Sequence, residues 1–228
     1  MNKLLTTIAA VSITAISFTS ANSAEFRLGL MLSADGSYGV AEETLKDSGR
    51  KTEEHAVMVD SSSSGFAEVA FENLMGITVG LEVTTQAIEL EKETRVIRAE
   101  GGTDAGADSG TQDIQASVED YYVMYVAIPL GSTGAYAKLG LAQAELQTKE
   151  TLATGSSYAN VDMEGTQLGM GYLGTLGERG FYKLETTYTE FDKMGLNGSE
   201  AGATAAAFNK IDAQITGVSA RVAFGVRF

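Results

Sequence analysis

The chain of 228 residues contains no cysteine and no tryptophan, and it has a single histidine and a single proline. The lack of cysteine excludes disulfide bonds, thiolate metal sites and a cysteine nucleophile. One histidine, His55, leaves little room for a multi-histidine metal site or for histidine-based catalysis. Basic residues are also few, 16 Lys and Arg against 30 Asp and Glu. No nucleic-acid partner is expected, because binding phosphates requires clustered positive charge.

The first 24 residues have the three-part layout of a secretory signal peptide. Lys3 gives a positive start, residues 4–18 are apolar, and small residues lead to a cleavage point after Ser23 or Ala24. A membrane-anchoring helix is the alternative, but the apolar run is shorter than the ~20 residues that a span requires. No later stretch is long enough for a transmembrane helix. The sequence therefore predicts a signal peptide over 1–24 and one exported domain over 25–228.

Apolar residues recur at every second position in eight segments of this domain. In the first, Leu28, Leu30 and Leu32 alternate with Gly29 and Met31. Such alternation indicates strands with one apolar face. The segment 117–130 is apolar on both faces, so its phase stays open. The eight segments are 25–33, 67–72, 77–84, 117–130, 137–142, 167–172, 182–188 and 221–228.

Long and short connections alternate along the chain. The long ones cover 34–64, 85–115, 146–164 and 192–212, whereas Asn73–Met75, Gly131–Gly134 and Thr175–Arg179 are turn-sized. Long loops on one side and short turns on the other are typical of outer-membrane barrels. We therefore predict an all-β protein, an eight-stranded antiparallel up-and-down transmembrane β-barrel with periplasmic termini and four long extracellular loops.

The second face of the strands decides which side of the sheet meets water. It holds mostly Gly, Ala and Thr with a few charged groups, which suits a narrow, crowded lumen better than a solvent-facing coat. The alternative is the solvated face of a secreted β-sandwich. Because charges of both signs occur there, we expect lumenal ion pairs; a charged lining of a transport path is the alternative. The predicted network comprises Arg27, Glu68, Glu72, Glu82, Lys138, Lys183, Glu185, Arg221 and Arg227.

The last strand places an apolar or aromatic residue at every second position up to the terminal carboxylate. These residues are Val222, Phe224, Val226 and Phe228. An aromatic end suits the membrane interface, where amphipathic rings are favoured. The pattern resembles the C-terminal signal by which the barrel-assembly machinery recognises outer-membrane barrels, and we expect that machinery to be a partner.

Three short motifs support a family resemblance. They are YVMYVAIPL at Tyr122–Leu130, GMGY at Gly169–Tyr172 and KLETTY at Lys183–Tyr188. With the eight strands, they resemble the opacity-protein and small OmpA-, OmpX- and OmpW-like group of outer-membrane β-barrels, a porin family. This resemblance implies a location in a Gram-negative type of outer membrane, among lipid and lipopolysaccharide.

Few residues of the sequence suggest catalysis or metal binding. Some barrels of this kind are lipid A acyltransferases with a loop histidine, and His55 has Asp60 and Ser61–Ser64 nearby, but no further motif supports catalysis. Asp104, Asp108 and Asp113 lie in a Gly-rich segment whose spacing is not that of an EF-hand. We expect no catalytic residue, cofactor or metal site.

The favoured function is therefore a non-enzymatic surface protein, structural or adhesive through its extracellular loops. The alternative is a narrow porin-like channel for small, possibly apolar solutes, as OmpW-like members suggest, and a lipid-modifying enzyme is third. A surface ligand is expected at loop 85–115. We predict that this loop is a projecting hairpin with a Gly-rich tip, against a charged helix of about three turns over 87–99.

Overall fold

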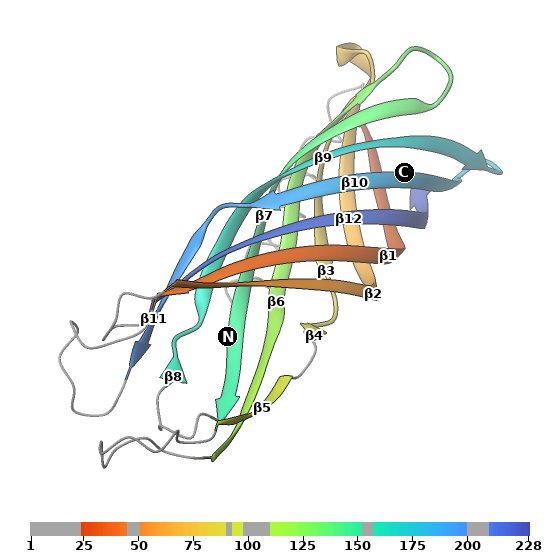
Figure 1. Ribbon diagram of the computed structural model, residues 1–228. Helices are drawn as coiled ribbons and strands as arrows, with labels where there is room; N and C mark the ends of the chain where they lie inside the picture. The colour runs from red at the N-terminus through yellow and green to blue at the C-terminus, as the bar shows by residue number, and fades with distance from the viewer. Residues whose placement is uncertain (1–23, 45–50, 90–92, 98–109, 152–156, 200–209) are drawn as a thin grey trace, which may run out of the picture.

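The computed structural model describes residues 24–44, 51–89, 93–97, 110–151, 157–199 and 210–228 (Figure 1). The predicted signal peptide lies outside this range except for Ala24. Eight long strands form the barrel: β1 (Ala24–Thr44), β2 (Lys51–Phe71), β3 (Ile77–Thr84), β6 (Gly110–Pro129), β7 (Ala135–Thr151), β9 (Val161–Leu176), β10 (Gly180–Phe191) and β12 (Lys210–Arg227). Four short strands and a 3-10 turn accompany them: β4 (Ile88–Glu89), β5 (Glu93–Ile97), β8 (Ser157–Tyr158), β11 (Met194–Ser199) and η1 (Glu72–Leu74).

Each long strand pairs antiparallel with its neighbours in the order β1-β2-β3-β6-β7-β9-β10-β12. The sheet closes where β1 pairs with β12, in a register that runs from Arg27↔Arg227 to Thr44↔Lys210. Closure removes the free edges that a membrane would not tolerate, because backbone groups in lipid must be hydrogen-bonded internally. The predicted closed, eight-stranded, up-and-down barrel is confirmed.

The apolar residues of the alternating strands point out of the barrel. Leu30 and Leu32 are 72% and 62% exposed, whereas Met31 between them is 1% exposed. An apolar exterior around a partly polar interior is the arrangement of a membrane barrel, not of a water-soluble one. Among the described residues, no helix is long and apolar enough to cross a membrane.

A β-bulge interrupts segment 117–130, the segment that is apolar on both faces. The β6–β7 register shifts between Glu119 and Tyr122, and Asp120 has a positive φ of 51°. The inserted residue changes the phase of the alternation. Below the bulge, Val123, Tyr125 and Ala127 are buried and the apolar residues between them are exposed, so both faces are apolar there. Above the bulge, Val118 packs against the interior cluster.

The strands continue far into the segments predicted as long loops. β1 and β2 pair from Ala24↔Phe71 to Thr44↔Lys51, so most of 34–64 is a hairpin. These extensions carry no strong alternation because they reach beyond the lipid, where neither face must be apolar. The true connections are therefore shorter than the sequence indicated.

Segment 85–115 also contains strand. Ile88 pairs with Val118, and β5 pairs with β6 from Glu93↔Ile114 to Ile97↔Gly110. The predicted hairpin is confirmed over these residues and the competing helix is wrong there. The Gly-rich tip lies outside the described residues.

Candidate functional site

Six charged side chains form one connected chain across the lumen. All six are buried, at most 7% exposed. Three are positive and three negative, so their charges cancel within the barrel. In order of contact they are Arg221 on β12, Glu82 on β3, Lys138 on β7, Glu185 and Lys183 on β10, and Glu68 on β2.

The ion pairs in this chain have short contacts. Arg221 Nη1 lies 2.9 and 3.0 Å from the two carboxylate oxygens of Glu82. Lys138 Nζ donates to Glu82 Oε2 at 3.1 Å and to Glu185 Oε2 at 3.2 Å. Lys183 pairs with both Glu185 and Glu68. A buried charge is tolerated only when it is paired and hydrogen-bonded in this way.

Two tyrosines complete the chain. The Tyr125 hydroxyl donates to Glu68 Oε1 and the Tyr136 hydroxyl to Glu185 Oε1, each at 2.5 Å. Lys138 Nζ also lies 4.0 Å from the centroid of the Tyr125 ring, within the range of a cation–π contact. The rings fill the space beside the charges, so the lumen is packed at this level.

Inward-facing glycines make room for those rings. A Cβ atom at Gly171 would lie 2.5 Å from the ring and hydroxyl of Tyr136, and one at Gly80 would lie 2.6 Å from the Tyr125 hydroxyl. Glycine in a strand often marks a place where another group approaches the backbone closely. The glycines of the polar face are therefore part of the same packed layer.

Three of the residues expected in the network lie at or beyond its periplasmic end. Arg27 Nη1 is 3.9 Å from Glu68 Oε2, and Arg27 also pairs with Glu25. Arg227 is half-buried, 3.7 Å from Glu25, and donates to the carbonyl of Glu178. Glu72 is exposed in η1, because β2 ends at Phe71 and the alternation stops before its side chain can enter the lumen. Its assignment to the lumen is wrong.

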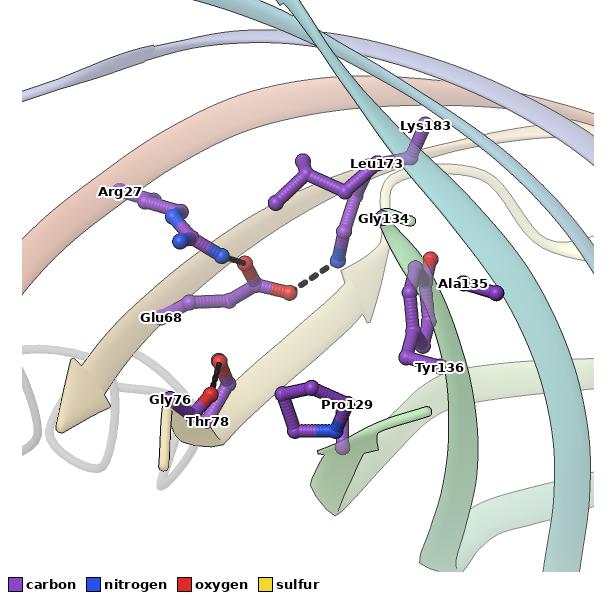
Figure 2. A pocket seen from close by; sticks show the side chains of 11 residues that line it. Arg27, Glu68, Gly76, Thr78, Pro129, Gly134, Ala135, Tyr136, Leu173 and Lys183 are labelled. Carbon is purple, nitrogen blue, oxygen red and sulfur yellow. Dashed lines mark hydrogen bonds and ion pairs between the residues drawn. The ribbon is translucent and has the colours of Figure 1, made fainter. Parts of the chain in front are cut away.

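A cavity of about 160 Å³, lined in part by Arg27, Glu68 and Lys183, lies on the periplasmic side of the network (Figure 2). Figure 2 shows Glu68 between Arg27 and Lys183, with Tyr136 and Pro129 across the cavity. This cavity is bounded on its inner side by the ion pairs.

The extracellular half of the lumen contains a large apolar cluster. Val123, Ala144, Leu146, Met163 and Leu196, all buried, pack together from β6, β7, β9 and β11. Beside this cluster is a second cavity of about 100 Å³, bounded on its inner side by Glu82 and Arg221. The lumen is therefore divided into a periplasmic cavity, a charged barrier and an extracellular chamber whose wall is partly apolar.

The residues considered for catalysis are not brought together. His55 lies on β2, exposed, where Nδ1 contacts the Tyr38 hydroxyl at 2.7 Å and Nε2 lies 3.0 Å from Glu53. Asp60 accepts instead from the backbone N–H of Ser61. No group of three or more His, Cys, Asp or Glu suited to a metal occurs among the described residues. Asp104 and Asp108 lie outside them, and so does the side chain of Asp113.

The C-terminal residues lie on the outer surface at the seam of the barrel. Phe224, Val226 and Phe228 are exposed on the lipid-facing side, and Val222 is partly exposed on the same face. Phe228 exchanges both backbone hydrogen bonds with Phe26, and the two rings lie 6.4 Å apart. The last residue thus completes the pairing that closes the barrel.

No protein-family model and no curated protein sequence matches this chain. Solved structures do match. The outer membrane protein OprG from Pseudomonas aeruginosa has 14% identity and a TM-score of 0.50, over 90% of this chain and 96% of that one. The fold is that of a small outer-membrane β-barrel.

Two further solved structures have lower similarity. The outer membrane protease OmpT from Escherichia coli has 8% identity and a TM-score of 0.43, over 88% of this chain and 96% of that one. Ail, the attachment invasion locus protein of Yersinia pestis, has 10% identity and a TM-score of 0.34, over 89% and 99%. At such identities the comparisons define the fold alone.

The prediction from the sequence included neither the two lumenal tyrosines nor the opposition of Asp35 and Asp60 across β1 and β2. Tyr136 lies two residues before Lys138 on the same face, so period-2 alternation alone places it in the lumen. Tyr125 gave no such signal, because its outward-facing neighbours Met124 and Val126 are apolar too. The two aspartates lie in a segment that was expected to be loop.

Proposed function

We propose that this chain is a non-enzymatic surface protein of the outer membrane, structural or adhesive through the extracellular extensions of its strands. The observation that supports this most is the buried chain of ion pairs, which leaves no open path through the lumen at that level. The separation of His55 from Asp60 and the serines also favours a protein without catalysis. In this proposal residues 1–24 act as the signal peptide and Val222 to Phe228 act as the assembly signal. Lipid and lipopolysaccharide surround the barrel.

The adhesive part of the proposal rests on open strand edges. Of the described residues of β2, those from Lys51 to Ser62 have no strand partner on the side away from β1, and β4 and β5 pair only with β6. An exposed edge offers backbone donors and acceptors to an extended segment of another molecule. Segment 85–115 is therefore the proposed place for a surface ligand.

The test compares cells that display the wild-type chain with cells that display a variant in which 86–116 is replaced by a short Gly-containing turn. We expect the variant to reach the surface in equal amounts, since the membrane part of the barrel is unchanged, and to adhere less to other cells and to coated surfaces. Equal adherence at equal surface amounts would reject the adhesive role of this segment.

A second candidate function is a route for small apolar solutes that ends in the membrane. It is favoured by the apolar part of the wall of the extracellular chamber, to which Met58, Ile88 and Phe191 contribute. Uptake of a small apolar dye into vesicles that contain the refolded protein, compared with empty vesicles, tests it; equal rates would reject it.

A further inference from the structure

The buried ion pairs connect the two cavities of the lumen. Glu68 lines the periplasmic cavity of about 160 Å³, and Glu82 lines the extracellular chamber of about 100 Å³. Between these two carboxylates lie Lys183, Glu185 and Lys138, in that order of contact. Carboxylate and ammonium groups therefore alternate all the way from one cavity to the other.

The contacts along this path lie within or near hydrogen-bond distance. Lys183 Nζ donates to Glu68 Oε1 and lies 3.5 Å from Glu185 Oε1. Lys138 Nζ donates to the other oxygen of Glu185, Oε2, at 3.2 Å and to Glu82 Oε2 at 3.1 Å. An ammonium group has three N–H donors and a protonated carboxyl group has one O–H donor, so each of the five side chains can pass on a proton.

Both end carboxylates have room for water beside them. Glu68 Oε2 is buried and has no hydrogen-bond partner among the described residues, since Arg27 Nη1 lies 3.9 Å from it. Buried polar atoms are normally satisfied by protein or by ordered water. Each cavity has several times the roughly 10–15 Å³ that one water requires on this measure. Thr78 in the periplasmic cavity, and Ser62 and Thr189 in the extracellular chamber, offer further polar partners for water.

Exposed residues on each wall connect the two cavities with the surrounding water. Arg27, on the wall of the periplasmic cavity, keeps 14% of its side chain exposed. Asp60, on the wall of the extracellular chamber, is exposed. Figure 2 shows the carboxylate of Glu68 between Arg27 and Lys183 at the edge of the periplasmic cavity. The path of titratable groups thus begins and ends next to cavities that water can enter.

We propose that the ion-pair network conducts protons between the two cavities while it blocks other ions. An eight-stranded lumen filled by charged side chains and tyrosine rings leaves no room for a hydrated ion, whereas a proton moves by exchange between groups already in contact. Burial penalises the charged forms of amines and carboxyl groups alike, so a neutral amine–acid pair lies closer in free energy to the ion pair than it does in water. This activity goes beyond the proposed surface role and depends neither on adhesion nor on segment 85–115.

One passage moves a single proton and returns every group to its starting charge. A hydronium ion in the periplasmic cavity protonates Glu68, whose carboxyl group turns and presents the proton to Lys183. Lys183 gives one ammonium proton to Glu185 and takes up the proton of Glu68. Lys138 in the same way gives a proton to Glu82 and takes up the proton of Glu185. Glu82 releases its proton to water in the extracellular chamber, and the pH difference across the membrane sets the direction.

The experiment measures proton entry into phosphatidylcholine vesicles that contain the refolded full barrel and an entrapped pH-sensitive dye. The outside is acidified, and equal K⁺ on both sides with valinomycin holds the membrane potential at zero. We expect the internal pH to fall several-fold faster than in empty vesicles of the same lipid. Entry of Na⁺, followed with an entrapped Na⁺-sensitive dye, should not exceed that of empty vesicles.

Two variants on the same strand locate the path. Glu185→Gln keeps the shape of the middle side chain and leaves each lysine with one carboxylate partner, but an amide does not relay the proton. The proton flux of this variant should fall to the level of empty vesicles. Glu190→Gln is the matched control, because Glu190 is an exposed carboxylate on the outer face of β10, and it should leave the proton flux unchanged.

Three outcomes would overturn the proposal. These are a wild-type proton flux equal to that of empty vesicles, equal proton fluxes in wild type and folded Glu185→Gln, and Na⁺ entry above that of empty vesicles, which would identify a water-filled pore. If Glu185→Gln does not fold, as judged by heat-modifiable gel migration, an unchanged flux in Lys138→Gln has the same meaning. Adherence of cells that display the chain is independent of all three outcomes, so a failure here leaves the proposed surface role in place.

Discussion

Replacing Arg221 by methionine tests whether the lumenal ion pairs support the fold. Arg221 and Glu82 have side chains 4% and 3% exposed and are in contact at 2.9 Å. The variant leaves Glu82 with Lys138 as its remaining cation. Removing one partner of a buried pair typically costs about 3–5 kcal/mol, because the other charge stays buried without full compensation. We expect a loss of that size in the free energy of unfolding.

The assay is urea unfolding in lipid vesicles, followed by far-ultraviolet circular dichroism and by the folded band in unheated gels. Lys210→Met is the matched control: Lys210 pairs with Asp212 at 2.8 Å, but the two side chains are 53% and 44% exposed. Exposed pairs contribute under about 1 kcal/mol.

A double-mutant cycle separates the interaction free energy of the Arg221–Glu82 pair from the contributions of the individual side chains. The double variant Arg221→Met/Glu82→Leu removes both charges, and Lys138 keeps Glu185 as a partner. It should therefore lose less than the sum of the two single variants. A loss under about 1 kcal/mol for Arg221→Met, or strict additivity in the cycle, would show that this ion pair does not stabilise the fold.

Further predictions concern the wall and the ends of the barrel. Gly171→Ala should destabilise the barrel by about 1–3 kcal/mol in the same assay, because its Cβ would overlap the Tyr136 ring; a neutral effect would contradict the packing. At the bulge, Asp120→Gly should be tolerated and Asp120→Val should cost about 1–2 kcal/mol, since φ is 51° there; equal stabilities would argue against the bulge. Phe228→Ser should sharply lower the yield of folded barrel in the outer membrane. A normal yield would show that closure and assembly do not depend on Phe228. Amide exchange at Arg95 and Gln112, which are paired across β5 and β6, should be slow; exchange as fast as in an unstructured chain would reject the hairpin.

The membrane part of the fold was predictable because lipid imposes a strict pattern. Leu28, Leu30 and Leu32 must all face outward, and a period of two then fixes where Arg27 and Met31 point. The strand count, the closed topology and the inward direction of most charged residues follow from this one constraint.

Other features could not be derived in this way. Above the membrane neither face of a strand must be apolar, so the extent of β1 to Thr44 had no signal in the sequence. Glu72 fitted the alternation of β2, but turn geometry ended the strand one residue earlier. The opposition of Asp35 and Asp60 depends on the β1–β2 register, which the sequence does not specify across a segment that was expected to be loop.

Buried ion pairs close the lumen of this barrel. Planar-bilayer recording of the refolded wild-type protein tests it most directly. Eight strands enclose an interior only just wide enough for side chains, and here that interior holds six paired charges and two tyrosines. We therefore expect no steady single-channel current. Stable, large conductance steps from wild-type protein would contradict it.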